Sequence, residues 1–446
     1  MTTLNFATVM IILASCLMSN PSIYAQNVVI PDANFKTYLL GQNAINTNGD
    51  AEIQISEAQA FNGMLNLNSL NIADLTGIES FTNLNTLYCS NNQLSTLNLS
   101  NNTALSTLSC NNNQLSSLNL SSNPLLTLVA CNDNQLSSLN LSNNPLLSLL
   151  SCNNNQLSNL NIRNNTSITR LYCDNNQLSS LDLSGNTMLD LLSCNNNQLA
   201  NLNLNGNIAL KLLACNNNQL TNLNLDDNTA ITAIACNNNK LSRIDLSNNT
   251  ALMTLSCDNN QLTVLDLDKN ATLTRLSCNN NQLSHLDLSK NTALVRLFCT
   301  NNQLISLNVR NGNNSNFTHF HANNNPNLTC IQVTDISYSV ANWTNVDSVA
   351  NFRTFCTVTG VTTTKATLSN VQVYPNPTNK RLTIALDKLY PTATITINNI
   401  MGQPVWVNNY SGVQNIDIDL EIANGVYFLS IETEEHKTKS IKFIKN

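Results

Sequence analysis

The chain has 446 residues, 42% of them hydrophobic and only 10% charged, and its formal net charge is −6. The negative charge argues against nucleic acid as a partner, because proteins that bind nucleic acid present clustered Lys and Arg to the phosphates. The apolar content argues against a disordered chain, and the length leaves room for several modules.

Residues 1–25 predict a signal peptide, because an apolar run from Phe6 to Met18 is followed by a short segment that ends before Gln26. The run is too short to cross a bilayer, and no other stretch approaches a membrane span, so we expect no transmembrane segment. The residues around Cys16 also fit a lipoprotein cleavage box, which would place a lipid on this cysteine.

Residues 26–63 predict an N-terminal cap with two short helices, one near Pro31 and one near Ser56. The loop between them resembles an EF-hand, with oxygen-bearing side chains at positions that hold calcium. Asn replaces the first Asp and Ala51 replaces the turn glycine, so a polar capping turn without metal is the alternative. The candidate calcium ligands are Asn46, Asn48, Asp50, Glu52 and Glu57.

Residues 64–322 predict a solenoid, because a cysteine recurs every 21 residues over eleven repeats. Each period has an apolar residue two before the cysteine, Asn three after it and Leu five after it. The Leu-x-Cys segment has the period of a strand, so we expect thin coils of parallel β-strands. The Asn column should be buried, with its amides hydrogen-bonded to the loops of their own and adjacent coils. The cysteines are Cys89, Cys110, Cys131, Cys152, Cys173, Cys194, Cys215, Cys236, Cys257, Cys278 and Cys299.

This repeat resembles the leucine-rich repeats of bacterial surface adhesins of the internalin J type, whose repeats stack into a cysteine ladder. The resemblance covers roughly residues 60–312 and implies surface interaction rather than catalysis. Free cysteines behave as small buried hydrophobic residues, which favours a packing role. Disulfides between coils are the rival, although the strand spacing is long for a disulfide and an odd number leaves one thiol over. A metal site would need clustered cysteines, which a single column lacks.

Side chains three and one before each cysteine should point outward on the concave face of the solenoid. Several of them are Leu, with Arg and Tyr among them, and this composition is typical of protein-binding surfaces. The alternative is that these leucines are exposed without a partner, as single surface apolar residues often are. The candidate ligand-binding residues are Leu128, Leu149, Arg170, Tyr172, Leu191, Leu212, Arg275, Arg296 and Phe298.

The register shifts by two residues after Cys299, which places Ala322 in the next cysteine position. His319 and His321 should then both point outward from one strand. A His-x-His pair can bind a metal, but no third ligand is evident, so a solvated face is the alternative.

Residues 323–357 predict a C-terminal cap for the solenoid, and residues 358–369 predict a linker. The cap contains the two cysteines outside the ladder, Cys330 and Cys356. In an exported chain they most simply form one disulfide, and two buried thiols are the alternative.

Residues 370–446 lose the repeat and show short alternating strands, the first two at 381–386 and 394–397, with turns near Gly412 and Gly425. This pattern predicts a β-sandwich. Val-Tyr-Pro-Asn-Pro before the first strand, Gly-Val-Tyr-Phe-Leu at Gly425 and a Lys-punctuated last strand resemble the type A C-terminal sorting domain of type IX secretion, which is Ig-like. The resemblance implies recognition by an outer-membrane translocon, cleavage of the domain, and release or lipopolysaccharide attachment of the body on a Gram-negative cell.

Together these patterns predict a mainly β protein: a leucine-rich-repeat solenoid with a small helical N-terminal cap, then an Ig-like β-sandwich. We expect a surface-displayed binding or adhesion protein whose partner is a protein or glycan on a host, prey or neighbouring cell. No catalytic residue is identified, since no nucleophile with a base, carboxylate pair or phosphate loop is evident. No cofactor is expected, apart from possible calcium in the cap. A structural surface-layer component and a surface glycan hydrolase are the alternatives.

Overall fold

The computed structural model describes residues 26–356, 371–399, 403–433 and 438–446, and the chain divides into two compact units, Met1–Cys356 and Thr357–Asn446. The predicted signal peptide, with Cys16, and the predicted linker lie outside the described residues. No helix among the residues that the structure describes combines the length and apolarity needed to cross a membrane.

Two short helices cap the N-terminal end of the first unit, α2 (Ala33–Leu40) and α3 (Ile55–Ala60). Asp32 begins α2 and accepts hydrogen bonds from the N–H groups of Asn34 and Phe35 with one carboxylate oxygen. Its other oxygen accepts from the N–H of Ala73, at 2.8 Å, which joins the cap to the first coil. Phe35 and Leu39 are buried in the same core as the solenoid, so the helix seals the open end of the array.

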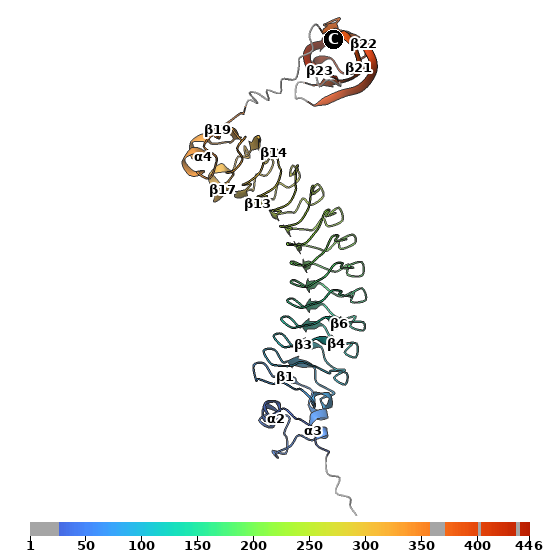
Figure 1. Ribbon diagram of the computed structural model, residues 1–446, viewed down its shortest axis with the longest axis vertical. Helices are drawn as coiled ribbons and strands as arrows, with labels where there is room; N and C mark the ends of the chain where they lie inside the picture. Colours follow the sequence, from blue (N-terminus) through green and yellow to red (C-terminus); the bar gives the residue numbers. More distant parts are fainter. Residues whose placement is uncertain (1–25, 357–370, 400–402, 434–437) are drawn as a thin grey trace, which may run out of the picture. The chain divides into compact units, whose positions relative to one another are not determined.

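The solenoid is built on one long sheet of parallel three-residue strands in unbroken register, which we call the main sheet (Figure 1). Each strand pairs with the strand one coil later, and the sheet lines the concave side of the curved array. The prediction of parallel coils is confirmed. Within the described residues the main sheet comprises β1 (Met64–Asn66), β2 (Thr86–Tyr88), β3 (Thr107–Ser109), β5 (Leu128–Ala130), β7 (Leu149–Ser151), β8 (Arg170–Tyr172), β9 (Leu191–Ser193), β10 (Leu212–Ala214), β11 (Ala233–Ala235), β12 (Thr254–Ser256), β13 (Arg275–Ser277), β15 (Arg296–Phe298) and β17 (His319–His321).

The convex side of the array has only short stretches of sheet, near its two ends. In the coils between β6 and β14 the described residues form no strands on this side. The convex strands are β4 (Ser117–Asn119) with β6 (Ser138–Asn140), and β14 (His285–Asp287), β16 (Ser306–Asn308), β18 (Cys330–Gln332) and β19 (Asn351–Arg353).

The eleven ladder cysteines are free thiols and fully buried, so the packing interpretation is confirmed. They lie in one continuous core with the leucine columns. Several thiols also reach a backbone carbonyl of the next coil; Cys173 Sγ, for example, lies 3.4 Å from the oxygen of Ser193. A thin coil has a single interior layer, so the cysteine and leucine columns together form the core of the solenoid.

The buried Asn ladder is also confirmed, and Asn176 shows its pattern. Its Nδ2 donates to the carbonyl oxygens of Cys152, in the preceding coil, and Cys173, in its own, while its Oδ1 accepts from the N–H of Leu157 at 3.0 Å. The residue before each ladder Asn has a positive φ, 54° at Asn175, which Asn tolerates better than most residues. The Asn-Asn run after each cysteine therefore serves both the turn and the ladder.

A second buried Asn column lies on the opposite side of the coil, and it is less completely paired. Asn186 donates from Nδ2 to the carbonyl oxygens of Ile162 and Asn165, but its buried Oδ1 has no partner. In the last repeat Gly312 stands in the column, and Asn311 takes over by donating to the carbonyl oxygen of Asn291 at 3.0 Å.

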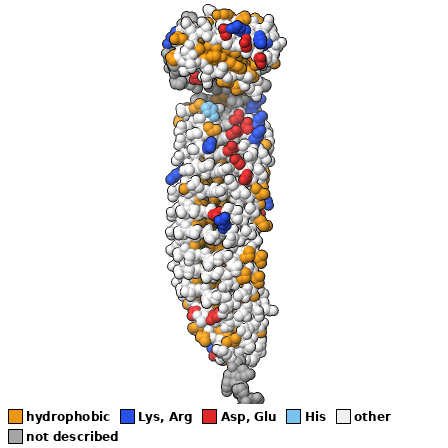
Figure 2. Space-filling view, turned by 90° about the vertical axis from the view of Figure 1, so that its right-hand side faces the viewer, with side chains coloured by type: hydrophobic (Ala, Val, Ile, Leu, Met, Phe, Trp, Pro, Cys, Tyr) orange, Lys and Arg blue, Asp and Glu red, His pale blue; other side chains and the backbone are white. Residues whose placement is uncertain are grey.

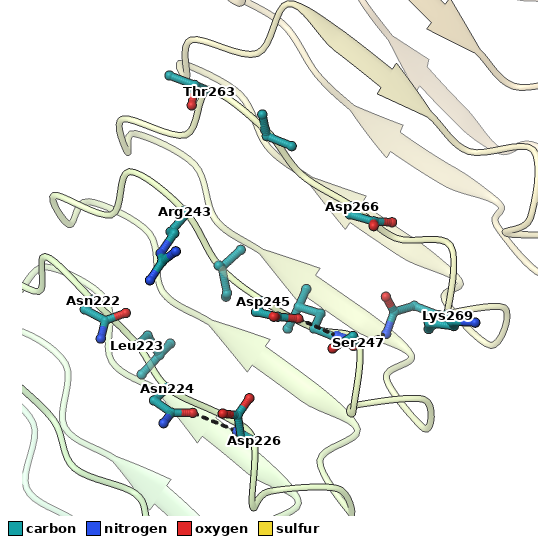
Figure 3. Close-up of a pocket in the computed structure, with 14 residues that line it drawn as sticks. Asn222, Leu223, Asn224, Asp226, Arg243, Asp245, Ser247, Thr263, Asp266 and Lys269 are labelled. Carbon is teal, nitrogen blue, oxygen red and sulfur yellow. Dashed lines mark hydrogen bonds between the residues drawn. The ribbon is translucent and has the colours of Figure 1, made fainter. Parts of the chain in front are cut away.

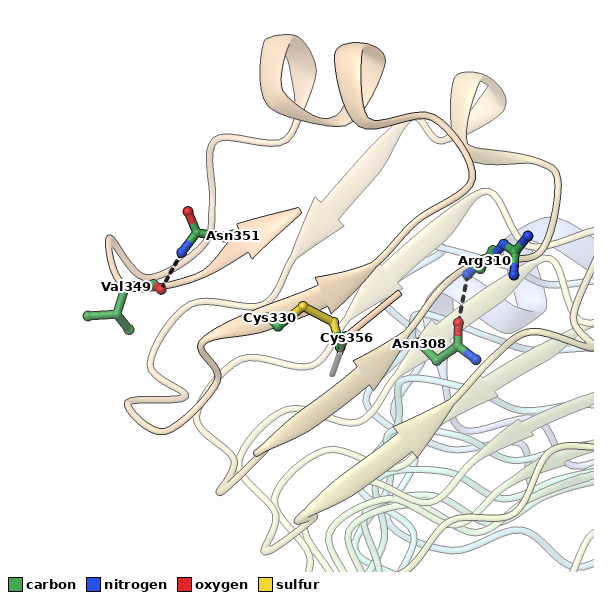
Figure 4. The surroundings of a disulfide bond; sticks show 6 residues. All are labelled: Asn308, Arg310, Cys330, Val349, Asn351 and Cys356. Atoms are coloured by element: carbon green, nitrogen blue, oxygen red, sulfur yellow. Dashed lines mark hydrogen bonds between the residues drawn. A yellow bond between two sulfur atoms is a disulfide. The ribbon is translucent and has the colours of Figure 1, made fainter. Parts of the chain in front are cut away.

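The C-terminal cap adds the short helices η2 (Asn314–Asn316) and α4 (Ile336–Asn342), and an N-terminal counterpart, η1 (Ile78–Ser80), lies in the first coil. Ala322 is fully buried in the cysteine position, as the register shift predicts. Trp343 stacks on Phe320 with ring centroids 4.0 Å apart and closes the core. A disulfide joins Cys330, on β18, to Cys356, after β19, at the end of the unit (Figure 4).

The second unit is an antiparallel sheet with its own core, consistent with the predicted Ig-like fold. The expectation of separate strands at 381–386 and 394–397 is wrong, because both belong to one long strand, β21. That strand continues through a register shift between Ala385 and Tyr390, which pair with Asn415 and Val413 on β22. Gly412, with a φ of +62°, lies within β22 between the paired residues Ser411 and Val413 and does not form a turn. The strands are β20 (Gln372–Tyr374), β21 (Arg381–Asn398), β22 (Pro404–Asp419), β23 (Gly425–Thr433) and β24 (Thr438–Lys445).

Candidate binding surface

The middle of the main sheet carries a strip of outward leucines, which we call the concave strip: Leu128, Leu149, Leu191 and Leu212, with Arg170 among them. The pairing register places these five residues directly beside one another on consecutive strands. Leu212 is 40% exposed and the other leucines are half-buried, because neighbouring side chains cover one another. Tyr172 is half-buried on the same strand as Arg170.

The other three candidate ligand-binding residues, Arg275, Arg296 and Phe298, lie at the C-terminal end of the main sheet. The structure adds His319 and His321, whose rings lie 5.8 and 5.1 Å from that of Phe298. The predicted alignment of Ala322 with the cysteine column is the signal that could have grouped the histidines with Phe298, because that alignment pairs β17 with β15.

The EF-hand-like loop is closed by its own hydrogen bonds. Glu57 Oε1 accepts from the N–H and hydroxyl of Thr47, and Oε2 accepts from the N–H of Gln54. Burial alone would raise the pKa of Glu57, but these bonds outweigh it and lower the pKa. Glu52 forms an ion pair with Lys36, whose Nζ lies 2.8 Å from Glu52 Oε2.

The remaining candidate calcium ligands are engaged in the same loop. Asp50 accepts from the N–H of Glu52 and the amide of Gln54, while Asn46 and Asn48 hydrogen-bond to atoms of Asp50. No group of three His, Cys, Asp or Glu side chains in the described part of the chain has a metal-binding arrangement, and His319 and His321 gain no third ligand there. The loop as arranged does not fit calcium and resembles a capping box, with Glu57 closing the start of α3.

Acidic side chains gather on the convex face toward the C-terminal coils, beside Lys and Arg (Figure 2). A groove of about 590 Å³ lies between three successive coils there, lined by Arg243, Asp245, Asp266 and Lys269 among others (Figure 3). The N–H and hydroxyl of Ser247 and the charge of Arg243 lower the pKa of Asp245. Cations and anions are mixed in this groove, so it presents no single sign of charge to a ligand.

Residues 372–446 match the family described as the secretion system C-terminal sorting domain. No curated protein matches the chain. Among solved structures, the functional domain of InlJ from Listeria monocytogenes, which includes a cysteine ladder, has 23% identity and a TM-score of 0.60, covering 95% of this chain and 100% of that chain.

Two further structures are similar in fold. The internalin InlF from Listeria monocytogenes has 22% identity and a TM-score of 0.56, covering 74% of this chain and 99% of that chain. The plant receptor RGFR1, solved in complex with the peptide hormone RGF2, has 17% identity and a TM-score of 0.52, covering 65% of this chain and 50% of that chain. The sorting domain implies a secreted or cell-surface protein. The chain thus carries a secretion-system C-terminal sorting domain behind a leucine-rich-repeat solenoid of the internalin fold.

Proposed function

We propose that the protein is exported by type IX secretion to the surface of a Gram-negative bacterium, where it acts as an adhesion protein through the concave face of its solenoid. The observation that carries this proposal is the concave strip: four leucines and Arg170 lie in register on five consecutive strands. Adjacent strands are about 4.8 Å apart, so the strip presents two pairs of neighbouring leucines on either side of Arg170 and not isolated leucines.

The composition of the strip suits a protein partner. Arg and Tyr are enriched where protein interfaces concentrate their binding energy, and Arg170 and Tyr172 stand at the centre of the strip. The rigid sheet behind them holds these side chains in place, so binding would require little ordering of the surface. We therefore propose binding in place of catalysis, on a host, prey or neighbouring cell.

The test compares two double variants of the full-length protein. Leu149→Asp with Leu191→Asp places charges in the concave strip, whereas Leu125→Asp with Leu146→Asp changes two leucines that are 48% and 49% exposed outside the main sheet. Binding of both variants and of the wild type to intact cells and to a glycan array would be measured. We expect only the first variant to lose binding. Equal binding by both variants would mean that the partner binds elsewhere or that the protein has a structural surface-layer role.

A further inference from the structure

The C-terminal end of the main sheet carries two arginines and a histidine in one column. Arg275 lies directly beside Arg296 on the next strand, and Arg296 lies directly beside His319 on the one after. All three side chains are exposed. The hydroxyl of Thr318 accepts from Arg296 Nε at 3.3 Å and lies 3.1 Å from His319 Nδ1, which holds the last two members together.

This column has no counter-ion among the described residues. Neither Arg275 nor Arg296 takes part in any of the ion pairs found there. Asp258 lies two coils before Phe298, but its carboxylate is engaged by the hydroxyl of Ser277 and the N–H of Asn279. Like charges directly opposite each other on neighbouring strands destabilise a sheet, so an anion bound across the two guanidinium groups would relieve their repulsion.

Beside the two arginines lies a cluster of three aromatic rings, Phe298, His319 and His321, of which His319 also belongs to the column. The two imidazoles are stacked with their planes 21° apart and centroids 6.4 Å apart, and each lies within 6 Å of the Phe298 ring. The guanidinium of Arg275 reaches over the same Phe298 ring at 6.0 Å. The imidazole planes are tilted by 37° and 39° to the Phe298 ring, so a ligand with C–H groups on one face can pack against one of these rings while its charged group faces the arginines.

We propose that this end of the concave face is a subsite for a carboxylated saccharide, such as a uronic acid unit of an acidic polysaccharide. A carboxylate matches the planar fork of an arginine, and the two arginines stand at the spacing of adjacent strands, about 4.8 Å. The C–H face of the sugar packs against the ring of Phe298. An acidic peptide would use the arginines but would not need the rings.

This inference rests on the proposed function only in using the same concave face, and its test is separate. Binding of oligogalacturonate to the full-length protein would be measured by calorimetry, with fully methyl-esterified oligogalacturonate as the uncharged control and poly-glutamate as the peptide control. We expect oligogalacturonate alone to bind well, with an affinity that falls as salt rises. Arg275→Gln with Arg296→Gln should weaken binding about tenfold or more, and Phe298→Ala severalfold.

Arg243→Gln, on the convex face, and the Leu149→Asp with Leu191→Asp variant should bind oligogalacturonate as the wild type does, so a failure of the concave strip leaves this subsite standing. All variants change exposed or half-buried side chains, and their melting temperatures verify folding. Absence of binding, equal binding of the methyl ester, or wild-type binding by the double Arg variant would overturn the proposal. Poly-glutamate binding as tight as that of the uronate, with no effect of Phe298→Ala, would replace the saccharide by an acidic peptide.

Discussion

The side-chain amide of Asn176 donates a hydrogen bond at 3.0 Å to the carbonyl oxygen of Cys152, which stands 24 residues earlier in the chain. Each coil of the solenoid is fastened to its neighbour by such a bond, beside the main sheet. Because a coil this thin has no second layer of side chains to pack against, these amide hydrogen bonds hold neighbouring coils together, as interlocking side chains do in thicker folds.

The two Asn columns should differ in what they contribute to stability. Asn176→Ala should lower the free energy of unfolding by about 2–3 kcal/mol, because it leaves the N–H of Leu157 buried without a partner and removes one of the two amide hydrogen bonds that the carbonyl oxygen of Cys152 accepts. Asn186→Ala should cost about 1 kcal/mol less, since the Oδ1 of Asn186 already has no partner. Urea denaturation of both variants measures the difference, and a larger loss for Asn186→Ala would contradict this ranking.

The ladder thiols should not react with thiol reagents in the folded protein, and replacing one sulfur atom by oxygen should lower the stability. Cys194→Ser should cost about 1–3 kcal/mol, the penalty for burying an unpaired hydroxyl. Cys173→Ser should cost less, because the carbonyl oxygen of Ser193 lies 3.4 Å from Cys173 Sγ and can accept from the new hydroxyl. Thiol reagents should label the wild-type ladder only in denaturant. Rapid labelling of several thiols in the native protein would refute the buried ladder.

Alkaline pH should destabilise the solenoid. Burial raises the pKa of the ladder thiols, to about 12 for Cys110, Cys152 and Cys236, with nearby Asp258 adding to the effect at Cys236. In the unfolded chain the thiols ionise near about 8.5, so the ladder's stability is complete below that pH and is lost as pH rises toward 12. Each thiol should remove about 1.4 kcal/mol per pH unit above about 8.5. Denaturation between pH 7 and 10 tests this, and replacing Cys152 and Cys236 with Ala should reduce the slope.

The N-terminal cap should weaken in acid and should not respond to calcium. Burial alone would raise the pKa of Asp32 and of Glu57, but the hydrogen bonds that each accepts outweigh it and lower both pKa values. Their contribution to stability is therefore present above the usual carboxyl pKa values and is lost as pH falls through the folded ones. Asp32→Ala should cost about 1–2 kcal/mol at neutral pH, as the loss of a helix cap does.

Calcium and a chelator should leave the melting temperature of the wild type unchanged, because Glu57 is engaged by Thr47 and Gln54 and Glu52 by Lys36. A calcium-dependent rise of the melting temperature would show that the loop rearranges into a metal site.

The repeat is the part of this fold that the sequence predicts most fully, since one period contains its strand, its turn and its ladder amide. The long strand β21 could not be predicted in this way. Lys388, Tyr390 and Pro391 interrupt the alternation and indicate a turn, and the strand continues because its register shifts between Ala385, which pairs with Asn415, and Tyr390, which pairs with Val413. The grouping of Phe298 with the histidines likewise depends on pairing between coils.

The last strand should decide whether the protein reaches the cell surface. β24 pairs with β23 along one edge, and on its other side the N–H of Thr378 donates to the carbonyl oxygen of Ile444 at 2.9 Å. Phe443 is fully buried in the core of this unit. Deleting residues 440–445 removes both contacts and exposes the edge of β23, so the sorting domain should lose its fold and its recognition.

The solenoid should remain folded in that deletion, because its coils contact only their neighbours and the second unit has its own core. We therefore expect the truncated chain to be trapped in the periplasm with a wild-type melting transition for the solenoid, while the intact chain appears at the surface. Lys442→Ala is the matched control, since Lys442 is exposed on the same strand and its removal leaves the core intact. Surface labelling and fractionation measure both. Truncated chain at the surface at the wild-type level would rule out a sorting role for β24, and the second unit would then be a further binding module.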